Sequence, residues 1–560
     1  MNQTIESLLS EALNLASKAC IDAQYLKDES LFAFERPRND AHGDYSSNIA
    51  MRLSKLCKKN PRELATQLLS AWTNELAKSG LDSQIESIKI EGPGFLNVSL
   101  TQAALNATIE EIETQSTTFG SKPIDGVDKI LIEFVSANPT GPLTIAHGRQ
   151  AALGDSLVRI LRFAGLDTTA EYYNNDTGVQ IQTLGLSVYQ RCREAAGLDF
   201  EFPENGYKGA YVMDIAKSIL AEKDNAWLED EVAATQHCRI HARDTIMQTI
   251  KDDLKSFGVS FGEYFSQEKL EGTGAVESTL EELKTKKSIY ENDGAWWLKS
   301  TEHGDDKDRV VIKSDGNYTY LMPDIAYHRN KFERGYTKLL DILGPDHHGY
   351  IARIKASQAL LGHNPDEVQI LIAQLVTLYE GKKVLRMSTR AGEFVSLKAL
   401  VDEVGIDAAR FFFVARKMDS HLDFDLELAK KRSSDNPVYY IQYAHARISS
   451  IRQTLKDKGI DIDMQTRDLS ALNMAEEIAL IKQLRAFPKT VQACAKAYEP
   501  HVLVEYLEQL AASFHKFYQQ CHIVDAEPPL AAARLALANA TQTVIKNGLN
   551  LLGVSSPEKM

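Results

Sequence analysis

The chain has 560 residues, of which 44% are hydrophobic, 8% aromatic and 25% charged, a composition typical of a globular protein with several domains. This excludes a mostly disordered chain, a collagen-like chain and a small protein held by disulfides. The 63 basic residues against 77 acidic ones give a net charge of −14, so contact with nucleic acid has to use local patches.

The apolar runs and the cysteines bear on where the protein works. No apolar run reaches the about 20 residues that a membrane-spanning helix needs, and the N-terminus lacks the basic start of a secretory signal. The six cysteines form no CxxC pair and no zinc-like spacing with histidine. The sequence therefore predicts a cytoplasmic protein with reduced thiols, no structural zinc and no membrane association.

Residues 1–115 are predicted to form a small α+β domain. Asn60 and Pro61 are typical of a helix cap and first turn. Gly92-Pro93-Gly94 interrupts the chain before 95–98, which alternates like a strand. A segment rich in Ser, Thr, Gly and Pro, 114–127, is interpreted as a linker.

From Lys129 the pattern becomes that of a doubly wound nucleotide-binding fold. The apolar run 130–135 has the length of a buried parallel strand, and a loop, 136–142, follows it. Next comes a helical apolar pattern that ends at Gly165. Strand, loop and helix in this order open a Rossmann-like fold.

The remaining segments complete a prediction of five parts. The first half of the Rossmann-like domain is assigned to 116–195 and an acidic, irregular insertion to 196–305. The second half is assigned to 306–400, where strand-like runs return at 309–313 and 339–343. Residues 401–560 have helical patterns throughout and are predicted to form an all-α bundle.

The loop 136–142 and the helix start at His147 form the first candidate site. Backbone amides of a tight turn and a helix N-terminus can face an anion, and His147 can donate a hydrogen bond to a phosphate. The alternative is an ordinary strand–helix connection in which His147 only caps the helix.

Two acids form the second candidate site. Glu133 lies inside an apolar strand, where a charge is costly unless it is at an edge or is paired with a cationic ligand or an internal Arg or Lys. Asp324 follows Tyr320 by four residues, so both side chains point the same way at a helix start. For Asp324, a simple helix cap is the alternative.

Two further segments resemble nucleotide-binding loops. Gly344 follows an apolar strand and allows close approach of a ligand, and Asp346 could hold a ribose hydroxyl. The adjacent histidines, His347 and His348, also suggest a metal, but no third ligand is obvious. The basic segment 382–392 suits a clamp on a polyphosphate, or is a solvated hairpin turn.

In chain order these segments resemble the class I arginyl-tRNA synthetases. The resemblance covers nearly the whole chain. The first signature is matched at 137–149, the adenosine-side motif at 346–350, the second signature loop at 386–392, the N-terminal domain at 34–97, the anticodon-binding domain at 440–447 and the C-terminal ending at 548–560.

Two signatures depart from the family's usual pattern. Thr144-Ile145-Ala146-His147 stands where the family usually has His-x-Gly-His, and Arg386-Met387-Ser388-Thr389 where it usually has Lys-Met-Ser-Lys. The missing lysine charge could come from Arg390, Lys382 or Lys383. We expect an active enzyme nevertheless, since the family tolerates loss of this lysine.

The resemblance implies an enzyme that activates L-arginine with ATP, with Mg²⁺ on the phosphates, and transfers it to the 3′-terminal adenosine of tRNA(Arg). The expected catalytic residues are His147, Met387, Ser388 and Arg390. The expected arginine-binding residues are Glu133, Asn138, Tyr320, Asp324 and His347. The expected ATP-binding residues are Pro139, Thr140, Gly141, Thr144, His147, Gly148, Gly344, Asp346, Met387 and Ser388.

The resemblance also places tRNA on two domains. The expected contacts are Phe95 and Asn97 in the N-terminal domain, and Tyr440, Tyr443, Tyr518 and Met560 in the C-terminal one. For each tyrosine, core packing is the alternative. A cytoplasmic monomer without DNA or membrane partners is expected.

Three other functions stay open on the residues alone: a class I synthetase for another amino acid, a small-molecule nucleotidyltransferase, and a non-catalytic tRNA-binding relative. A nucleotidyltransferase has no use for the C-terminal helices. A decayed synthetase is expected to lose some of Glu133, Asn138, Tyr320 and Asp324, all of which are present.

Overall fold

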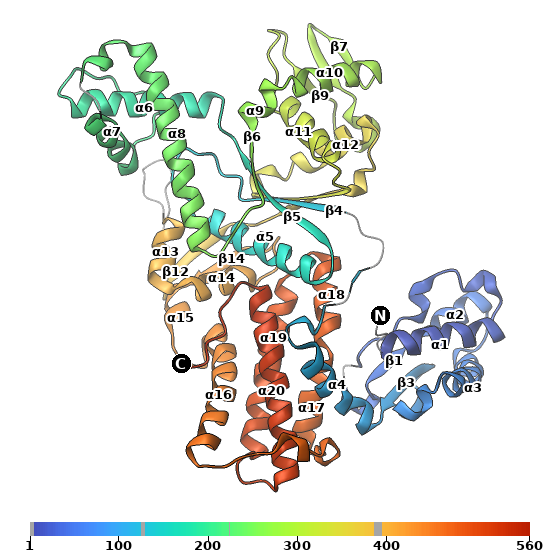
Figure 1. Ribbon diagram of the computed structural model, residues 1–560. Helices are drawn as coiled ribbons and strands as arrows, with labels where there is room; N and C mark the ends of the chain where they lie inside the picture. Colours follow the sequence, from blue (N-terminus) through green and yellow to red (C-terminus); the bar gives the residue numbers. More distant parts are fainter. Residues whose placement is uncertain (1–4, 38, 122, 125–128, 223–224, 386–394) are drawn as a thin grey trace. The chain divides into compact units, whose positions relative to one another are not determined.

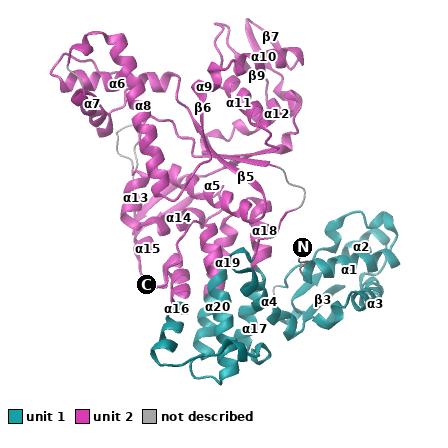
Figure 2. Ribbon diagram, viewed as in Figure 1, with its two compact units in different colours: residues 1–119, 448–486, 512–544 teal, residues 120–447, 487–511, 545–560 magenta. Residues whose placement is uncertain are grey.

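The computed structural model describes residues 5–37, 39–121, 123–124, 129–222, 225–385 and 395–560. The chain forms two compact units, distinguished by colour in Figure 2. Unit 1 contains Met1–Phe119, Ile448–Ala486 and Ala512–Val544, and unit 2 contains Gly120–Arg447, Phe487–Ala511 and Ile545–Met560.

Unit 1 is built on a three-stranded antiparallel sheet in the order β1-β3-β2. The predicted helix start at Asn60 is confirmed, because the Asn60 side chain accepts a hydrogen bond from the Arg62 amide at 2.9 Å. The predicted strand after Gly94 is β3. The elements wholly within this unit are α1 (Ile5–Cys20), β1 (Tyr45–Ser47), α2 (Ile49–Cys57), α3 (Pro61–Ser79), β2 (Ile85–Glu91), β3 (Phe95–Leu100), α4 (Gln102–Gln115) and α17 (Ala475–Arg485).

Three long helices contribute residues to both units. They are α16 (Pro437–Asp457), α19 (His501–Gln520) and α20 (Pro528–Leu551). Their inward faces are apolar, with Leu507, Phe517 and Leu537 all fully buried, as the helical pattern of the sequence predicts.

Unit 2 contains a five-stranded parallel sheet in the order β11-β10-β4-β5-β6. Numbered along the chain, this is the strand order of a doubly wound Rossmann-like fold, which confirms the predicted fold class. The order reverses between β4 and β10, where such folds open a crevice at the carboxyl ends of the strands. The strands are β4 (Lys129–Phe134), β5 (Asp167–Asn174), β6 (Glu263–Ser266), β10 (Lys338–Leu343) and β11 (Val368–Ile372).

The helices and small sheets around this core occupy the rest of unit 2 (Figure 1). Their bounds are α5 (Ile145–Phe163), α6 (Val179–Ala195), α7 (Ala210–Glu222), α8 (Glu231–Ser256), α9 (Gln267–Gly272), α10 (Ala275–Thr285), β7 (Ile289–Asn292), β8 (Ala295–Leu298), β9 (Arg309–Ile312), α11 (Leu321–Glu333), α12 (Tyr350–Leu361), β12 (Val376–Glu380), β13 (Lys383–Leu385), α13 (Leu397–Val404), α14 (Ile406–Val414), β14 (Leu422–Asp425), α15 (Leu426–Lys430) and α18 (Phe487–Ala497).

The segment 196–305 combines helices with one strand of the main sheet. Figure 1 shows α7 and α8 of this segment grouped with α6, which precedes it, and β6, which follows α8, pairs in parallel with β5. The strand-like run at 309–313 forms β9, which pairs with β8 in a separate antiparallel sheet rather than in the parallel one.

Helix α5 approaches the sheet closely because Gly154 faces β4. A Cβ atom at Gly154 would lie 2.3 Å from the Phe134 ring, so only glycine fits at this contact. Figure 1 shows α5 running alongside β5. The contact fixes the position of the helix whose first turn carries His147.

The middle of α5 and the middle of α14 are joined by a buried arginine. Arg410 donates to the Leu552 carbonyl at 3.0 Å and the Phe257 carbonyl at 3.1 Å, and it forms an ion pair of 2.5 Å with Asp155. These bonds hold the end of the chain against α5 within unit 2. Among the helices whose residues the structure describes, none is long and apolar enough to cross a membrane.

Candidate active site

A cavity of about 780 Å³ opens at the point where the strand order reverses. The carboxyl ends of β4 and β10 contribute Glu133 and Asp341, and α11 contributes Asp324. Eight of the predicted site residues line this one cavity: Glu133, Asn138, His147, Tyr320, Asp324, Gly344, Asp346 and His347. Residues up to 214 positions apart in sequence therefore meet where a doubly wound fold binds its ligand.

The loop after β4 has an uncommon backbone. Val135 and Ser136 both have positive φ angles, 68° and 40°, which are unfavourable for residues with a Cβ atom and most of all for a β-branched one. Neighbouring groups hold the loop there: the Tyr173 amide donates to Ser136 Oγ at 3.0 Å, and the Tyr172 hydroxyl donates to the Ala137 carbonyl at 2.7 Å. Strained backbone of this kind is concentrated at functional sites.

His147 lies in the first turn of α5 with a defined hydrogen bond. Its Nδ1 accepts from the Thr144 amide at 3.2 Å, so the neutral ring carries its proton on Nε2. Burial lowers the pKa of His147 to about 4. At neutral pH the ring is therefore an uncharged donor in the wall of the cavity, and Thr144, which replaces the usual signature histidine, caps the helix.

Asp324 combines burial with a mixed set of charged neighbours. Burial raises its pKa to about 6, and His328 together with a hydrogen bond from Tyr350 opposes that rise. Tyr320 is the residue immediately before α11, and its side chain is exposed. The predicted arrangement, with Tyr320 and Asp324 on the same side of a helix start, agrees with the cavity lining.

Glu133 has an internal partner. Lys331 Nζ lies 2.6 Å from Glu133 Oε2 and 2.7 Å from Asp341 Oδ1, and Lys331 is fully buried. Of the possibilities that the sequence left open for Glu133, the internal salt bridge is present. Glu133 also lines the cavity, so it can serve a ligand in addition to Lys331.

The loop after β10 is the most exposed wall. Asp346 and His347 are exposed, and their side chains lie 3.4 Å apart. At the opposite wall the Asn138 side-chain amide donates to Gln180 Oε1 at 2.7 Å. Both walls therefore present polar groups toward the open cavity.

Several residues expected near ATP lie beside the cavity without lining it: Pro139, Thr140, Gly141, Thr144 and Gly148. The Thr140 carbonyl accepts from Tyr211 at 2.6 Å, and a Cβ at Gly148 would lie 2.6 Å from the Leu397 side chain. These positions build the loop and the helix start. The predicted catalytic residues Met387, Ser388 and Arg390 lie outside the described residues.

Sequence reasoning missed a charged cluster in the wall of the cavity. Asp341 and His328 are buried and joined at 2.8 Å, and Lys331 completes the cluster. Asp341 interrupts the apolar strand Lys338–Leu343 in the way that Glu133 interrupts its own strand, which is the signal that could have found it.

The residues expected to bind tRNA lie in different surroundings. Phe95 is 37% exposed, whereas the Asn97 side chain is buried and bonded to Ser46 and Glu91. Tyr443 on α16 stacks on Tyr439 with ring centroids 6.2 Å apart. Tyr440 is half-buried, Tyr518 lies on α19 against Phe514 at 6.2 Å, and Met560 is exposed at the end of the chain.

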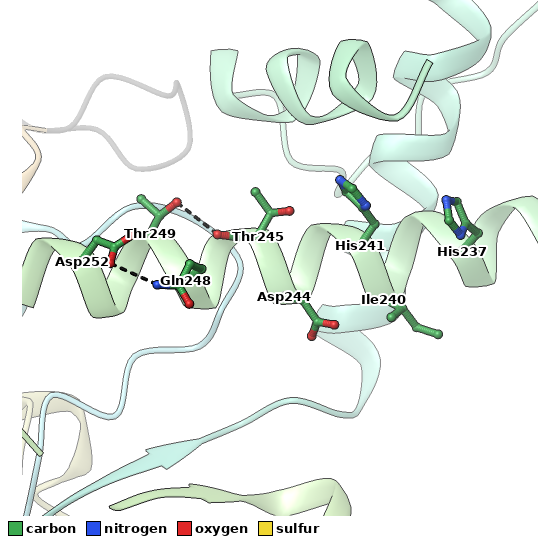
Figure 3. Close-up of a pocket in the computed structure, with 8 residues that line it drawn as sticks. All are labelled: His237, Ile240, His241, Asp244, Thr245, Gln248, Thr249 and Asp252. Atoms are coloured by element: carbon green, nitrogen blue, oxygen red, sulfur yellow. Dashed lines mark hydrogen bonds between the residues drawn. The ribbon is translucent and has the colours of Figure 1, made fainter. Parts of the chain in front are cut away.

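A second hollow, of about 610 Å³, lies along α8. Figure 3 shows its lining side chains, all from one helix, with His237 and His241 at one end and Asp252 at the other. It contains none of the predicted site residues, so the cavity between β4 and β10 is the candidate active site.

Comparisons with known proteins cover nearly the whole chain. Three family models match the chain: "Arginyl tRNA synthetase N terminal domain" at residues 3–100, "tRNA synthetases class I (R), catalytic domain" at 108–431 and "DALR anticodon binding domain" at 441–560. The catalytic-domain match includes every residue named above as lining the cavity.

Individual relatives match over nearly full length. An arginine–tRNA ligase of Syntrophotalea carbinolica is 43% identical, with all of both chains covered. One of Nitratidesulfovibrio vulgaris is 46% identical over 94% of this chain and 95% of its own. The solved Thermus thermophilus arginyl-tRNA synthetase, at 22% identity, shares the fold with a TM-score of 0.77 over 99% of this chain and 100% of its own.

Proposed function

The chain belongs to the arginyl-tRNA synthetase family, and we propose that the cavity between β4 and β10 is where L-arginine and ATP react. The enzyme is an arginine–tRNA ligase. The arginine carboxylate attacks the α-phosphate of ATP, giving arginyl-adenylate and pyrophosphate. The 3′-terminal adenosine of tRNA(Arg) then takes the arginyl group.

Catalysis in this proposal comes from positioning and charge stabilisation, with no protein nucleophile. His147 donates through Nε2 to the phosphates at the start of α5. Gly344 and Asp346 face the ribose. Mg²⁺ enters as part of the ATP substrate, on its phosphates. The signature residues Met387, Ser388 and Arg390 belong to the same step in the proposal.

The arginine side chain is assigned to the acidic wall. A guanidinium is planar, always charged and carries five donors, so a selective pocket needs several fixed acceptors. Asp324 and Glu133 supply carboxylates at one cavity, and this juxtaposition is the observation that carries the assignment. Tyr320 lies alongside, and Asn138 and His347 are assigned to the α-groups of the amino acid.

The pH dependence of arginine use tests the assignment. Since burial raises the pKa of Asp324 to about 6, the carboxylate is ionised above pH 6 and increasingly protonated below it. Only the ionised form attracts the guanidinium, so KM for arginine should rise about tenfold between pH 8 and pH 5, with KM for ATP not following. Steady-state kinetics across this range measure both constants.

The matched control is Asp324→Asn, which is always neutral at this position. Its KM for arginine should be high at every pH, without the rise below pH 6. A wild-type enzyme whose KM for arginine is flat from pH 8 to pH 5 would remove Asp324 from the arginine site.

We propose that residues of both units contact the tRNA. We also propose that the protein is a cytoplasmic monomer. Phe95 provides an exposed aromatic ring in the N-terminal domain, and Asn97 shapes the strand beside it. Tyr440, Tyr443, Tyr518 and Met560 are assigned to the anticodon. The proposed domain boundaries remain those predicted from the sequence, with domains at 1–115, 116–195, 196–305, 306–400 and 401–560.

Tyr443 gives the sharpest test of the anticodon assignment. Arg447 lies 5.2 Å from the Tyr443 ring, and Tyr439 stacks on it with the two ring planes 8° apart, so a base could extend this stack. Tyr443→Leu should weaken tRNA(Arg) binding about tenfold, the scale of one lost base–aromatic contact, in a filter-binding titration at fixed salt. Tyr443→Phe keeps the ring and should bind within about twofold of the wild type. Equal affinity of the Leu variant and the wild type would contradict the assignment.

A further inference from the structure

Four acids lie in register across four neighbouring strands of the parallel sheet. Asp341 of β10 is opposite Glu133 of β4, Glu133 is opposite Glu171 of β5, and Glu171 is opposite Glu263 of β6. Adjacent strands are about 4.8 Å apart, and residues in register share a face of the sheet. Such a row of like charges is unfavourable unless cations lie against it.

Lys331 of helix α11 and Arg334, the residue that caps its C-terminus, supply those cations. Lys331 contacts the first two acids of the row, Asp341 at 2.7 Å and Glu133 at 2.6 Å. Arg334, almost one turn later, contacts the other two, Glu171 Oε1 and Glu263 Oε2, each at 2.9 Å. The two cations therefore divide the row into two halves.

The two halves differ in their relation to the active site. Glu133 and Asp341 line the cavity, whereas Glu171, Glu263 and Arg334 are not among its lining residues. Lys331 is fully buried, while the Arg334 side chain is 23% exposed. The first turn of α11 carries Asp324, so the same helix both brings an acid to the cavity and holds the acids of the sheet below it.

We propose that Lys331 is a positioning residue for the arginine site, which acts by holding the Glu133 carboxylate in a fixed orientation. The Lys331 ammonium group donates a hydrogen bond to Glu133 Oε2. No residue that the structure describes donates a hydrogen bond to the other oxygen, Oε1, which is left for the guanidinium. This inference rests on the proposed function, in which Glu133 contacts arginine.

Removal of the Lys331 ammonium group would change the charge or the orientation of the Glu133 carboxylate. Asp341 would keep its contact with His328, whereas Glu133 would be a buried carboxylate opposite Asp341 without the Lys331 ammonium, so Glu133 takes up a proton or turns away. In either case the guanidinium loses a charge-assisted acceptor. The ATP side of the cavity, at the start of α5 and the end of β10, keeps its own groups.

The test is the Lys331→Met variant, which keeps the length of the side chain and removes the charge. KM for arginine should rise about tenfold or more, the scale of one lost charge-assisted contact, while KM for ATP stays within about twofold. Where Lys331→Met does not give folded protein, Lys331→Gln, which keeps N–H donors without the charge, is measured in the same way. Thermal melting of each variant records the loss of stability separately.

Arg334→Met is the matched control. It breaks an ion pair between the same helix and the same row of acids, but away from the cavity. It should lower the melting temperature while KM for arginine stays within about twofold of the wild type. An equal rise of KM in both variants would show that Lys331 only stabilises the packing of α11, and would overturn the inference.

A double-mutant cycle separates the inference from the function on which it rests. If Lys331 acts through Glu133, then Lys331→Met should add less than about twofold to KM for arginine in a Glu133→Gln background. If the two increases in KM for arginine multiply in the double variant, the inference is overturned. If Glu133→Gln alone leaves KM for arginine unchanged, the assignment of Glu133 to arginine fails, and the inference fails with it. If Glu133→Gln raises KM but Lys331→Met does not, only the inference fails.

Discussion

Replacing Asp324 with alanine is expected to lower kcat/KM for arginine by at least about a hundredfold, with KM for ATP changed by less than about twofold. Burial raises the pKa of this carboxyl group to about 6, so at neutral pH it is mostly an ionised acceptor in the wall of the cavity. A cation that loses such an acceptor on binding is left desolvated and unpaired, which costs more than the loss of an exposed contact. The aminoacylation rate at varied arginine, and separately at varied ATP, measures the two effects.

The control for this variant lies on the same helix. Glu333 is at the far end of α11, where it pairs with Arg329 at 2.9 Å and does not line the cavity. Glu333→Ala should change neither KM, because an exposed pair contributes little. Unaltered arginine kinetics in Asp324→Ala would place the guanidinium elsewhere in the cavity.

Replacing His147 with alanine is expected to slow adenylate formation about a hundredfold, the usual effect of removing one preorganised donor. The reason is the tautomer of the ring. Because Nδ1 accepts from the Thr144 amide, Nε2 carries the proton and can donate it directly in a hydrogen bond to a phosphate. The low pKa, about 4, keeps the ring in this neutral form over the working pH range. Single-turnover release of pyrophosphate from ATP in the presence of arginine and tRNA measures the step.

His147→Gln is the informative companion variant. The glutamine amide can place an N–H donor close to the former Nε2 position, so part of the lost rate should return. A His147→Ala enzyme with the wild-type rate would show that the altered first signature no longer works through this histidine.

Much of the catalytic fold could be predicted because its pattern is local. The apolar run that forms β4 and the helical repeat of α5 are each complete within about 20 residues, which is the range over which periodicity is informative. The run at 309–313 is also recognisable as a strand, but its sheet is not. A short apolar run has the same pattern in a parallel and an antiparallel sheet, so its partner depends on the tertiary fold.

The candidate site is predictable in its members but not in its pairings. Glu133 stands out because a charge in an apolar strand requires a partner, yet the partner is Lys331, 198 residues away in sequence. The same applies to Asp341, which only the strand order places beside Glu133. Sequence spacing indicates which side chains are unusual, whereas the topology decides which of them meet.

The left-handed pair Val135–Ser136 has a consequence for the folding stability of the chain. Glycine or asparagine at these positions would adopt the same angles at lower energy, so the native residues cost about 1–3 kcal/mol of folding free energy per strained residue. Glycine would also have more backbone conformations available to it. The strained pair therefore keeps the chain in one conformation where it leaves β4, the strand that carries Glu133.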